Sequence, residues 1–278
     1  MILFISLLGM FFGFPSGPEN FVNTGGEDTI RIWNRSTEAI DADQLGQYYL
    51  VSGGSLVKYD ASGDSAYSWS DPQTGAINAI DANDPMRILI YQKDFNLIRF
   101  LNNRLAPSSG IIRLDDLGIT VPLAVATSRQ GGFWVVDGTS FRLRQINMQL
   151  ATQVESAPLN LPSGTGSTGY RLTESGDHLL LLIPGKEIQV FDLFANLIKI
   201  IPLKVSSFNV YSNRILLVYP DKITLWKDPV TEEAVLVRSK GGEEERRLGG
   251  EFREACLYQD KLLIRMTGKV ILLRLSKK

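Results

Sequence analysis

Short apolar runs recur along the chain at a nearly regular spacing, and each is followed, after a turn, by a second run in which apolar and polar residues alternate. The first runs are 48–51, 88–91, 133–136, 179–182, 215–218 and 262–265. They are rich in Val, Ile, Leu and aromatic residues, whereas no segment keeps the apolar period of a helix over about ten residues. The pattern therefore predicts an all-β protein built from repeated hairpins.

The turns between paired runs carry hairpin signals such as Gly53-Gly54 and Asp137-Gly138. A repeat of roughly 43 residues with about four strands is typical of one blade of a β-propeller. Six units fit the chain from residue 25 onward, whereas seven would leave only about 36 residues for each blade. We therefore expect residues 25–278 to form a single propeller of six four-stranded blades.

One further strand, Thr29 to Asn34 (TIRIWN), comes too early to belong to a complete first blade. The last unit, in turn, ends after three strands. The N-terminal strand can complete it and so remove the exposed edges that an open stack of blades would present. The prediction is a ring closed by pairing an N-terminal strand with the last blade.

Residues 1–17 begin with an unbroken apolar stretch, Met1 to Phe14, which resembles the hydrophobic region of a signal peptide. It is shorter than the roughly 17 to 25 residues of a membrane-spanning helix, so no integral span is expected. No basic residue precedes Arg31, and the cleavage site is poor; a buried N-terminal strand is the alternative, although Pro15 and Pro18 interrupt it. We expect an exported, periplasmic protein, without a lipid anchor because no Cys follows the apolar stretch.

Composition limits the chemistry available to the chain. It is 44% hydrophobic and 21% charged, with a formal net charge of −1, which is typical of a globular protein and argues against a nucleic-acid partner that binds through a strong positive field. A single Cys cannot form an intramolecular disulfide, and a single His cannot build a multi-histidine metal site. No cofactor and no metal site are predicted.

Candidate catalytic residues are few. His178 precedes an apolar strand, and Cys256 occupies a strand position expected to face the core. Asp115 and Asp116 are adjacent, so on an extended segment their side chains point to opposite sides and do not flank one bond. Asp60, Asp64, Asp71, Asp81 and Asp84 alternate with turn-forming residues, as loop aspartates do. The sequence predicts no catalytic residue.

Two loops are candidate interaction sites. The first is a run of mixed charge between Gly pairs, in the segment 238–254. This pattern predicts a surface loop between the fifth and sixth blades. The second is the loop that contains Asp115 and Asp116. The candidates in the first loop are Arg238, Glu243, Glu244, Glu245, Arg246 and Arg247.

The innermost strand of each blade supplies a second set of candidates. These strands are expected near 39–44, 76–82, 122–128, 169–175, 207–212 and 254–259. Their polar positions, which would line a central channel, are Asn78, Thr127, Tyr170, Asn209, Glu254 and Tyr258. The six positions are mixed, and no acidic residue is common to them. Two alternative functions use these residues: a propeller-type lyase or hydrolase acting on a glycan or lactone, and a small-ligand sensor.

The middle of the chain carries a family resemblance. The segments DFNLIRFLNNRL, IIRLDDLGI, GFWVVDGTSFRLRQIN and KEIQVFDLFANLIKIIPLK, which lie within 94–204, resemble exported six-bladed propeller proteins of Bacteroidota. More specifically, the chain is similar to the plug subunit of the type 9 secretion translocon. The resemblance implies a non-catalytic scaffold or interaction subunit, with a protein partner in an outer-membrane secretion complex.

Overall fold

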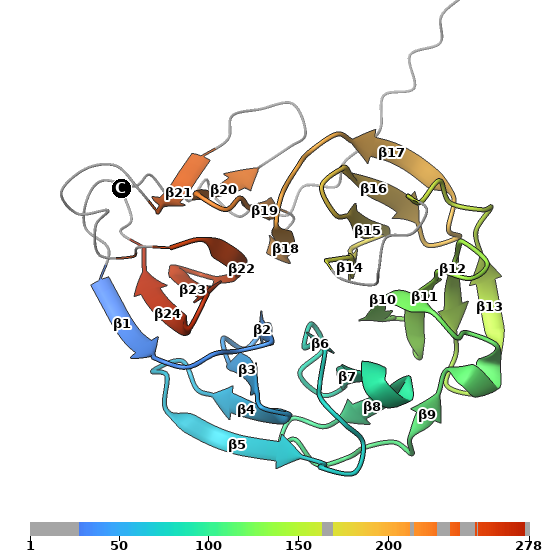
Figure 1. Ribbon diagram of the computed structural model, residues 1–278, viewed down its shortest axis with the longest axis horizontal. Coiled ribbons are helices and arrows are strands. Elements are labelled where there is room, and N and C mark those ends of the chain that lie inside the picture. Colours follow the sequence, from blue (N-terminus) through green and yellow to red (C-terminus); the bar gives the residue numbers. More distant parts are fainter. Residues whose placement is uncertain are drawn as a thin grey trace, which may run out of the picture.

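The computed structural model describes residues 28–162, 169–211, 214–226, 234–239, 248 and 250–275. Within these residues, β-strands form six four-stranded antiparallel sheets arranged as blades around one axis (Figure 1). The only helices in the described part of the chain are the single turns η1 (Lys93–Phe95) and η2 (Asp115–Leu117). The predicted all-β, six-bladed propeller is confirmed.

The blades follow one another in chain order, and the strands of each blade run in order from the axis outward. Blade one contains β2 (Ala39–Ala42), β3 (Tyr48–Ser52), β4 (Ser55–Tyr59) and β5 (Ser65–Ser70). Blade two contains β6 (Ala79–Asp81), β7 (Ile88–Gln92), β8 (Leu97–Leu101) and β9 (Ile112–Arg113). Blade three contains β10 (Pro122–Thr127), β11 (Phe133–Asp137), β12 (Arg142–Ile146) and β13 (Thr152–Glu155).

The second half of the ring repeats this order. Blade four contains β14 (Arg171–Ser175), β15 (His178–Ile183), β16 (Glu187–Asp192) and β17 (Leu197–Ile201). Blade five contains β18 (Ser207–Tyr211), β19 (Arg214–Val218), β20 (Lys222–Trp226) and β21 (Ala234–Arg238). Blade six contains β22 (Phe252–Tyr258), β23 (Lys261–Met266), β24 (Lys269–Arg274) and, on the rim, β1 (Asp28–Trp33).

The N-terminal strand closes the ring as predicted. β1 runs antiparallel to β24, with Asp28 opposite Arg274 and Trp33 opposite Val270. Trp33 is buried and contacts Tyr59 of blade one edge-on, with ring centroids 5.0 Å apart. The closing strand therefore joins blade six to blade one as well as completing its own sheet.

A repeated turn sets the position of the fourth strand in four blades. In blade one, Asp60 Oδ1 accepts hydrogen bonds from the backbone N–H groups of Ser62 (2.8 Å) and Asp64 (3.0 Å). Gly63, three residues after Asp60, has φ +84°. Asn102, Asn147 and Asp192 repeat both side-chain bonds and the positive φ in blades two, three and four. Asn and Asp suit this turn because the short side chain replaces a backbone acceptor.

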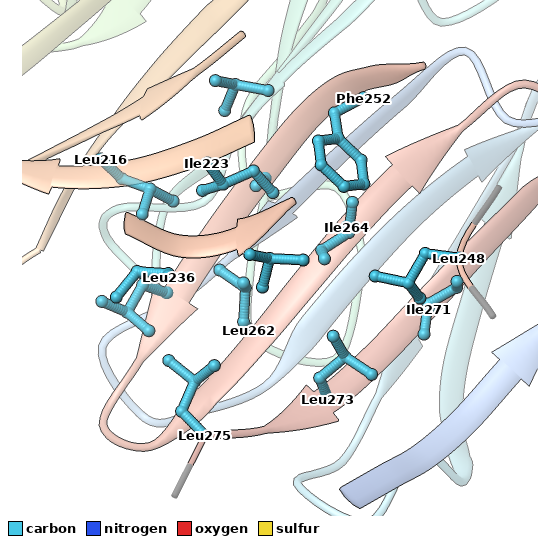
Figure 2. Packing of buried hydrophobic residues seen from close by; sticks show 14 of the residues in the cluster. Leu216, Ile223, Leu236, Leu248, Phe252, Leu262, Ile264, Ile271, Leu273 and Leu275 are labelled. Atoms are coloured by element: carbon cyan, nitrogen blue, oxygen red, sulfur yellow. The ribbon is translucent and has the colours of Figure 1, made fainter. Parts of the chain in front are cut away.

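Hydrophobic side chains fill the spaces between neighbouring blades. Figure 2 shows this packing between blades five and six, where Leu216 and Ile223 face Phe252, Leu262 and Ile264. All five side chains are fully buried. Burying an aliphatic or Phe side chain contributes about 1.5 to 3 kcal/mol, so these interfaces supply most of the cohesion between sheets.

Among the described residues, no helix is long and apolar enough to cross a bilayer. The signal-peptide-like segment 1–17 lies outside the described residues.

Candidate functional site: the ring axis and the rim

The innermost strands β2, β6, β10, β14, β18 and β22 surround the ring axis (Figure 1). Several of them carry a buried carboxylate that bonds to the backbone of another blade. Asp41 Oδ2 accepts the N–H of Ala82 at 2.8 Å, which links blade one to blade two. Asp81 Oδ2 accepts both the N–H (2.8 Å) and the hydroxyl (2.9 Å) of Thr127, which links blade two to blade three.

Glu254 makes the corresponding link across the closing interface. Its Oε2 accepts the N–H of Ile40 at 3.1 Å and the Nε of Arg265 at 2.9 Å. Arg265 also donates through Nη1 to the carbonyl of Thr37 at 3.1 Å. Blades six and one are therefore joined by charge-assisted hydrogen bonds in addition to the strand pairing on the rim.

Glu174 of β14 links blade four to blade three. Oε1 accepts the N–H of Arg129 at 3.0 Å, and Oε2 accepts the indole N–H of Trp134 at 2.6 Å. Both Glu174 and Trp134 are buried. The carboxylate thus satisfies the buried indole N–H of Trp134, which would otherwise lie unpaired in a low-dielectric interior, and a second, partly buried donor at Arg129.

Arg171 extends across the axis from blade four. β14 lies across the ring from β2, yet the guanidinium Nη2 lies 3.9 Å from Asp41 Oδ1 and Nη1 lies 3.6 Å from Glu254 Oε1. These distances are too long for hydrogen bonds, so the pairing is an ionic attraction between groups held by other contacts. A positive side chain therefore occupies the centre of the ring between two carboxylates.

Burial raises the pKa of Asp41 to about 6. The nearby Arg171 charge lowers it and the Asp81 charge raises it again, but desolvation is the largest effect because only 4% of the Asp41 side chain is exposed. Cys256 lies beside this carboxylate, with its Sγ 3.7 Å from Asp41 Oδ1. Burial and the Asp41 charge raise the pKa of the Cys256 thiol well above its usual range, so the thiol keeps its proton.

We call the polar groups near the axis the axial network: Asp41, Asp81, Arg171, Glu174, Glu254, Arg265 and Cys256, with the groups that they contact. Asp41, Asp81, Glu174 and Glu254 each have at least one oxygen bonded to a backbone N–H of another blade. Within the part of the chain that the structure describes, no group of three or more His, Cys, Asp or Glu residues is arranged to hold a metal ion.

The structure brings together three of the six predicted channel residues and separates the others. Thr127 bonds to Asp81, Glu254 to Arg265, and Asn209 Nδ2 lies 3.7 Å from Cys256 Sγ. All three belong to the axial network.

The remaining three predicted channel residues lie elsewhere. Tyr170 is buried in the hydrophobic cluster between blades three and four. Asn78 is exposed just before β6, where its side-chain oxygen accepts the N–H of Lys93 at 2.6 Å. Tyr258 ends β22 and packs edge-on against Tyr211, with ring centroids 6.1 Å apart. Alternation along a strand does not by itself distinguish these surroundings.

Sequence reasoning missed four central residues of the network: Asp41, Asp81, Arg171 and Glu174. Asp81 falls within the predicted innermost strand 76–82 but was grouped with the loop aspartates, and that grouping was wrong, because Asp81 is the buried last residue of β6. A signal was present: the tetrapeptide Ala-Ile-Asp-Ala occurs twice, at 39–42 and 79–82, at the same position in successive blades.

The predicted interaction loops are described only in part. Arg238 is the exposed last residue of β21. The other candidates of that loop lie outside the described residues: Glu243, Glu244, Glu245, Arg246 and Arg247. Asp115 and Asp116 are exposed on η2, and Asp115 Oδ1 accepts a hydrogen bond from Asn96 Nδ2 at 2.7 Å.

The rim of blade four exposes an apolar surface that sequence reasoning did not single out. On β17, Leu197 is 50% exposed, Ile198 55% and Ile200 46%, and Phe194 in the preceding turn is 75% exposed. We call these four residues the β17 patch. Clustered exposed apolar side chains are a frequent mark of a surface that contacts another molecule.

Comparison with known proteins supports the fold. No protein-family model matches the chain, and no curated protein sequence matches it. Among solved structures, a Bacteroides thetaiotaomicron protein of unknown function superposes with a TM-score of 0.65 at 9% identity, over 92% of this chain and 73% of that one. A streptogramin B lyase gives 0.56 at 13% identity, over 85% and 78%. BBS1N, in complex with ARL6DN, gives 0.52 at 13% identity, over 86% and 78%.

Proposed function

We propose that this protein is a non-catalytic propeller of the cell envelope that binds another protein through its rim. The observation that carries the proposal is the β17 patch, in which four large apolar side chains are each 46% to 75% exposed. Exposing them to water is unfavourable, and contact with a partner removes that cost. The rest of the ring then acts as a rigid support for this surface.

The axial network supports a structural role for the centre. Its carboxylates hold neighbouring blades together, and Arg171 lies between Asp41 and Glu254 on the axis. A propeller lyase or hydrolase would need some of these groups for its substrate. The similarity to a streptogramin B lyase, at 13% identity, concerns the fold alone.

The finer proposal is a periplasmic subunit of an outer-membrane secretion complex. It rests on the apolar segment 1–17, on the resemblance to Bacteroidota propellers and to the plug subunit of the type 9 translocon, and on the fold shared with a Bacteroides protein. The BBS1N structure, solved with ARL6DN, illustrates a propeller of similar fold in a protein complex. In this role the disc acts by contact area and needs no cofactor.

The test is co-purification from the native organism. The full chain carries a C-terminal affinity tag, the envelope is extracted gently with detergent, and mass spectrometry identifies what is retained in stoichiometric amount. We expect a partner from an outer-membrane complex with the wild type. Changing Phe194→Ser together with Leu197→Ser should abolish retention, whereas Tyr67→Ser on the rim of blade one should not, since Tyr67 is also exposed but isolated on a polar strand. A wild-type chain recovered without any partner would contradict the proposal and turn attention to a substrate at the axis.

A further inference from the structure

The outer edge of β17 is available for strand pairing. β17 is the last strand of its sheet, and it pairs with β16 on one side only. Among the described residues, no strand pairs with its other side. In an antiparallel sheet, alternate residues of such a strand direct their N–H and C=O groups outward, where they can form a ladder with an added strand.

The side chains of β17 distinguish it from the other rim strands. β5 (SAYSWS) and β13 (TQVE) are mostly polar, and β9 has only two residues. β17 (LIKII) has four exposed residues in succession, three of them aliphatic. The pairing of β17 with β16 contains a register shift. This shift is not special to β17, because β1, β5, β13 and β21 each pair with a neighbouring strand through one as well. β21 (AVLVR) is also apolar, but its Leu236 and Val237 are buried, so the exposure of the aliphatic side chains of β17 is the distinguishing feature.

Lys199 indicates what charge a strand should carry to pair with the outer edge of β17. It is exposed at the centre of β17, and its side chain makes no ion pair among the described residues. A lysine on a sheet edge disfavours pairing with a second copy, because it brings a like charge to the same junction. An acidic residue opposite Lys199 would turn this charge into an attraction.

We propose that β17 receives an extended aliphatic segment of the partner protein, with an Asp or Glu opposite Lys199, as a fifth strand of blade four. This inference rests on the proposed function and specifies how its surface is used. Backbone hydrogen bonds supply part of the affinity, the aliphatic contacts with Leu197, Ile198 and Ile200 supply the rest, and the charge pair selects the partner. A second copy of this chain is the occupant that Lys199 disfavours.

The test uses the purified full chain and three fluorescein-labelled nine-residue peptides, with binding followed by fluorescence anisotropy. The peptides alternate Val and Thr and differ only at the centre or in the backbone: one has a central Glu, one a central Lys, and one the central Glu with N-methylated neighbours. We expect saturable binding of the Glu peptide and at least about tenfold weaker binding of the Lys peptide, because a like charge faces Lys199. The N-methylated peptide should not bind, because it cannot complete the ladder.

Protein variants assign the effect to β17. Lys199→Glu should reverse the preference between the Glu and Lys peptides, while Lys93→Glu, a change at another exposed lysine, should leave it unchanged. Failure of the Glu peptide to bind, or binding that Lys199→Glu leaves unaltered, would overturn the inference. So would a dimer of the wild type in sedimentation equilibrium that Ile198→Thr with Ile200→Thr dissociates. If the inference fails while the wild type still retains a partner through the β17 patch, the proposed function stands.

Discussion

The innermost and outermost strands of blade four differ in a way that reverses the usual distribution of polar and apolar residues. At the axis, β14 carries Arg171 and Glu174, which are mostly withdrawn from water. At the rim, β17 leaves Leu197, Ile198 and Ile200 about half exposed. Charged groups are seldom buried without partners, and those of β14 are indeed paired with groups from other blades. The aliphatic side chains of β17 have no such covering among the described residues, so the unsatisfied surface of this blade lies on its rim.

The largest expected effect comes from removing a carboxylate on the axial side. Glu174→Ala leaves the N–H of Arg129 and the indole N–H of Trp134 without an acceptor and opens a small cavity. We expect the free energy of unfolding to fall by about 3 to 5 kcal/mol, measured by urea denaturation.

Two further variants test the origin of that loss. Glu174→Gln keeps one carbonyl oxygen and should lose about half as much. Glu251→Ala, which removes an exposed glutamate paired with the exposed Arg253, should cost less than about 1 kcal/mol. Equal losses for Glu174→Ala and Glu251→Ala would show that the axial carboxylate is not a structural link.

A second expected effect is a dependence of stability on pH that arises at the axis. The pKa of Asp41 is about 6 in the folded protein, against 3.8 for the ordinary side chain, so the folded state holds a proton that the unfolded chain releases between about pH 4 and pH 6. Ionisation of Asp41 therefore lowers stability as pH rises through this range, by about 3 kcal/mol in total.

Comparison with Asp41→Asn isolates this effect, because Asn cannot ionise and other groups contribute equally to both proteins. The variant should gain stability relative to the wild type between pH 4 and pH 7, in urea titrations at several pH values. A constant difference across that range would mean that the pKa of Asp41 is not raised. The groups facing this carboxylate are Arg171, Asp81 and Cys256.

The smallest expected effect on stability is on the rim. Ile198→Thr with Ile200→Thr should change the free energy of unfolding by less than about 1 kcal/mol, because both side chains are already half exposed and Thr suits a strand. Leu181→Ala, in the middle of β15 and fully buried, is the matched loss of apolar volume and should cost about 2 to 5 kcal/mol. A large loss for the rim variant would mean that β17 is required for folding and would weaken its assignment to binding.

Much of the architecture could be predicted from the sequence because its signals are local. The apolar runs and their turns identified the hairpin of each blade, and the isolated strand around Trp33 could be assigned to the last blade by counting strands. Alternation and turn chemistry act over a few residues, so they can be read directly along the chain.

The axial network could not be predicted in the same way. Arg171 meets Asp41 and Glu254 only because the ring brings strands from opposite sides to one axis. No local pattern indicates such a meeting, and Asp81 resembled a loop residue because Asn, Asp and Pro follow it.

The β17 patch escaped prediction for a different reason. LIKII is a short apolar run, which usually indicates a buried strand. Its exposure follows from its place as the fourth strand of a blade, at the rim, where none of the described sheets covers it.

The pairing of Asp28 with Arg274 has a consequence for the order in which the molecule assembles. During synthesis β1 leaves the ribosome before any of the blades, but its partner β24 is made after all the other strands of the ring. Contacts between residues so distant in sequence form slowly, because the entropy of closing the chain is lost before any contact compensates for it. The first strand therefore has no strand to pair with until blade six has been made, although Trp33 can already pack against Tyr59 of blade one, and a chain arrested before that point is an open arc. Pairing of β1 with β24 is therefore the step that completes the ring, and a chaperone would act most usefully by shielding the unpaired strand before this step.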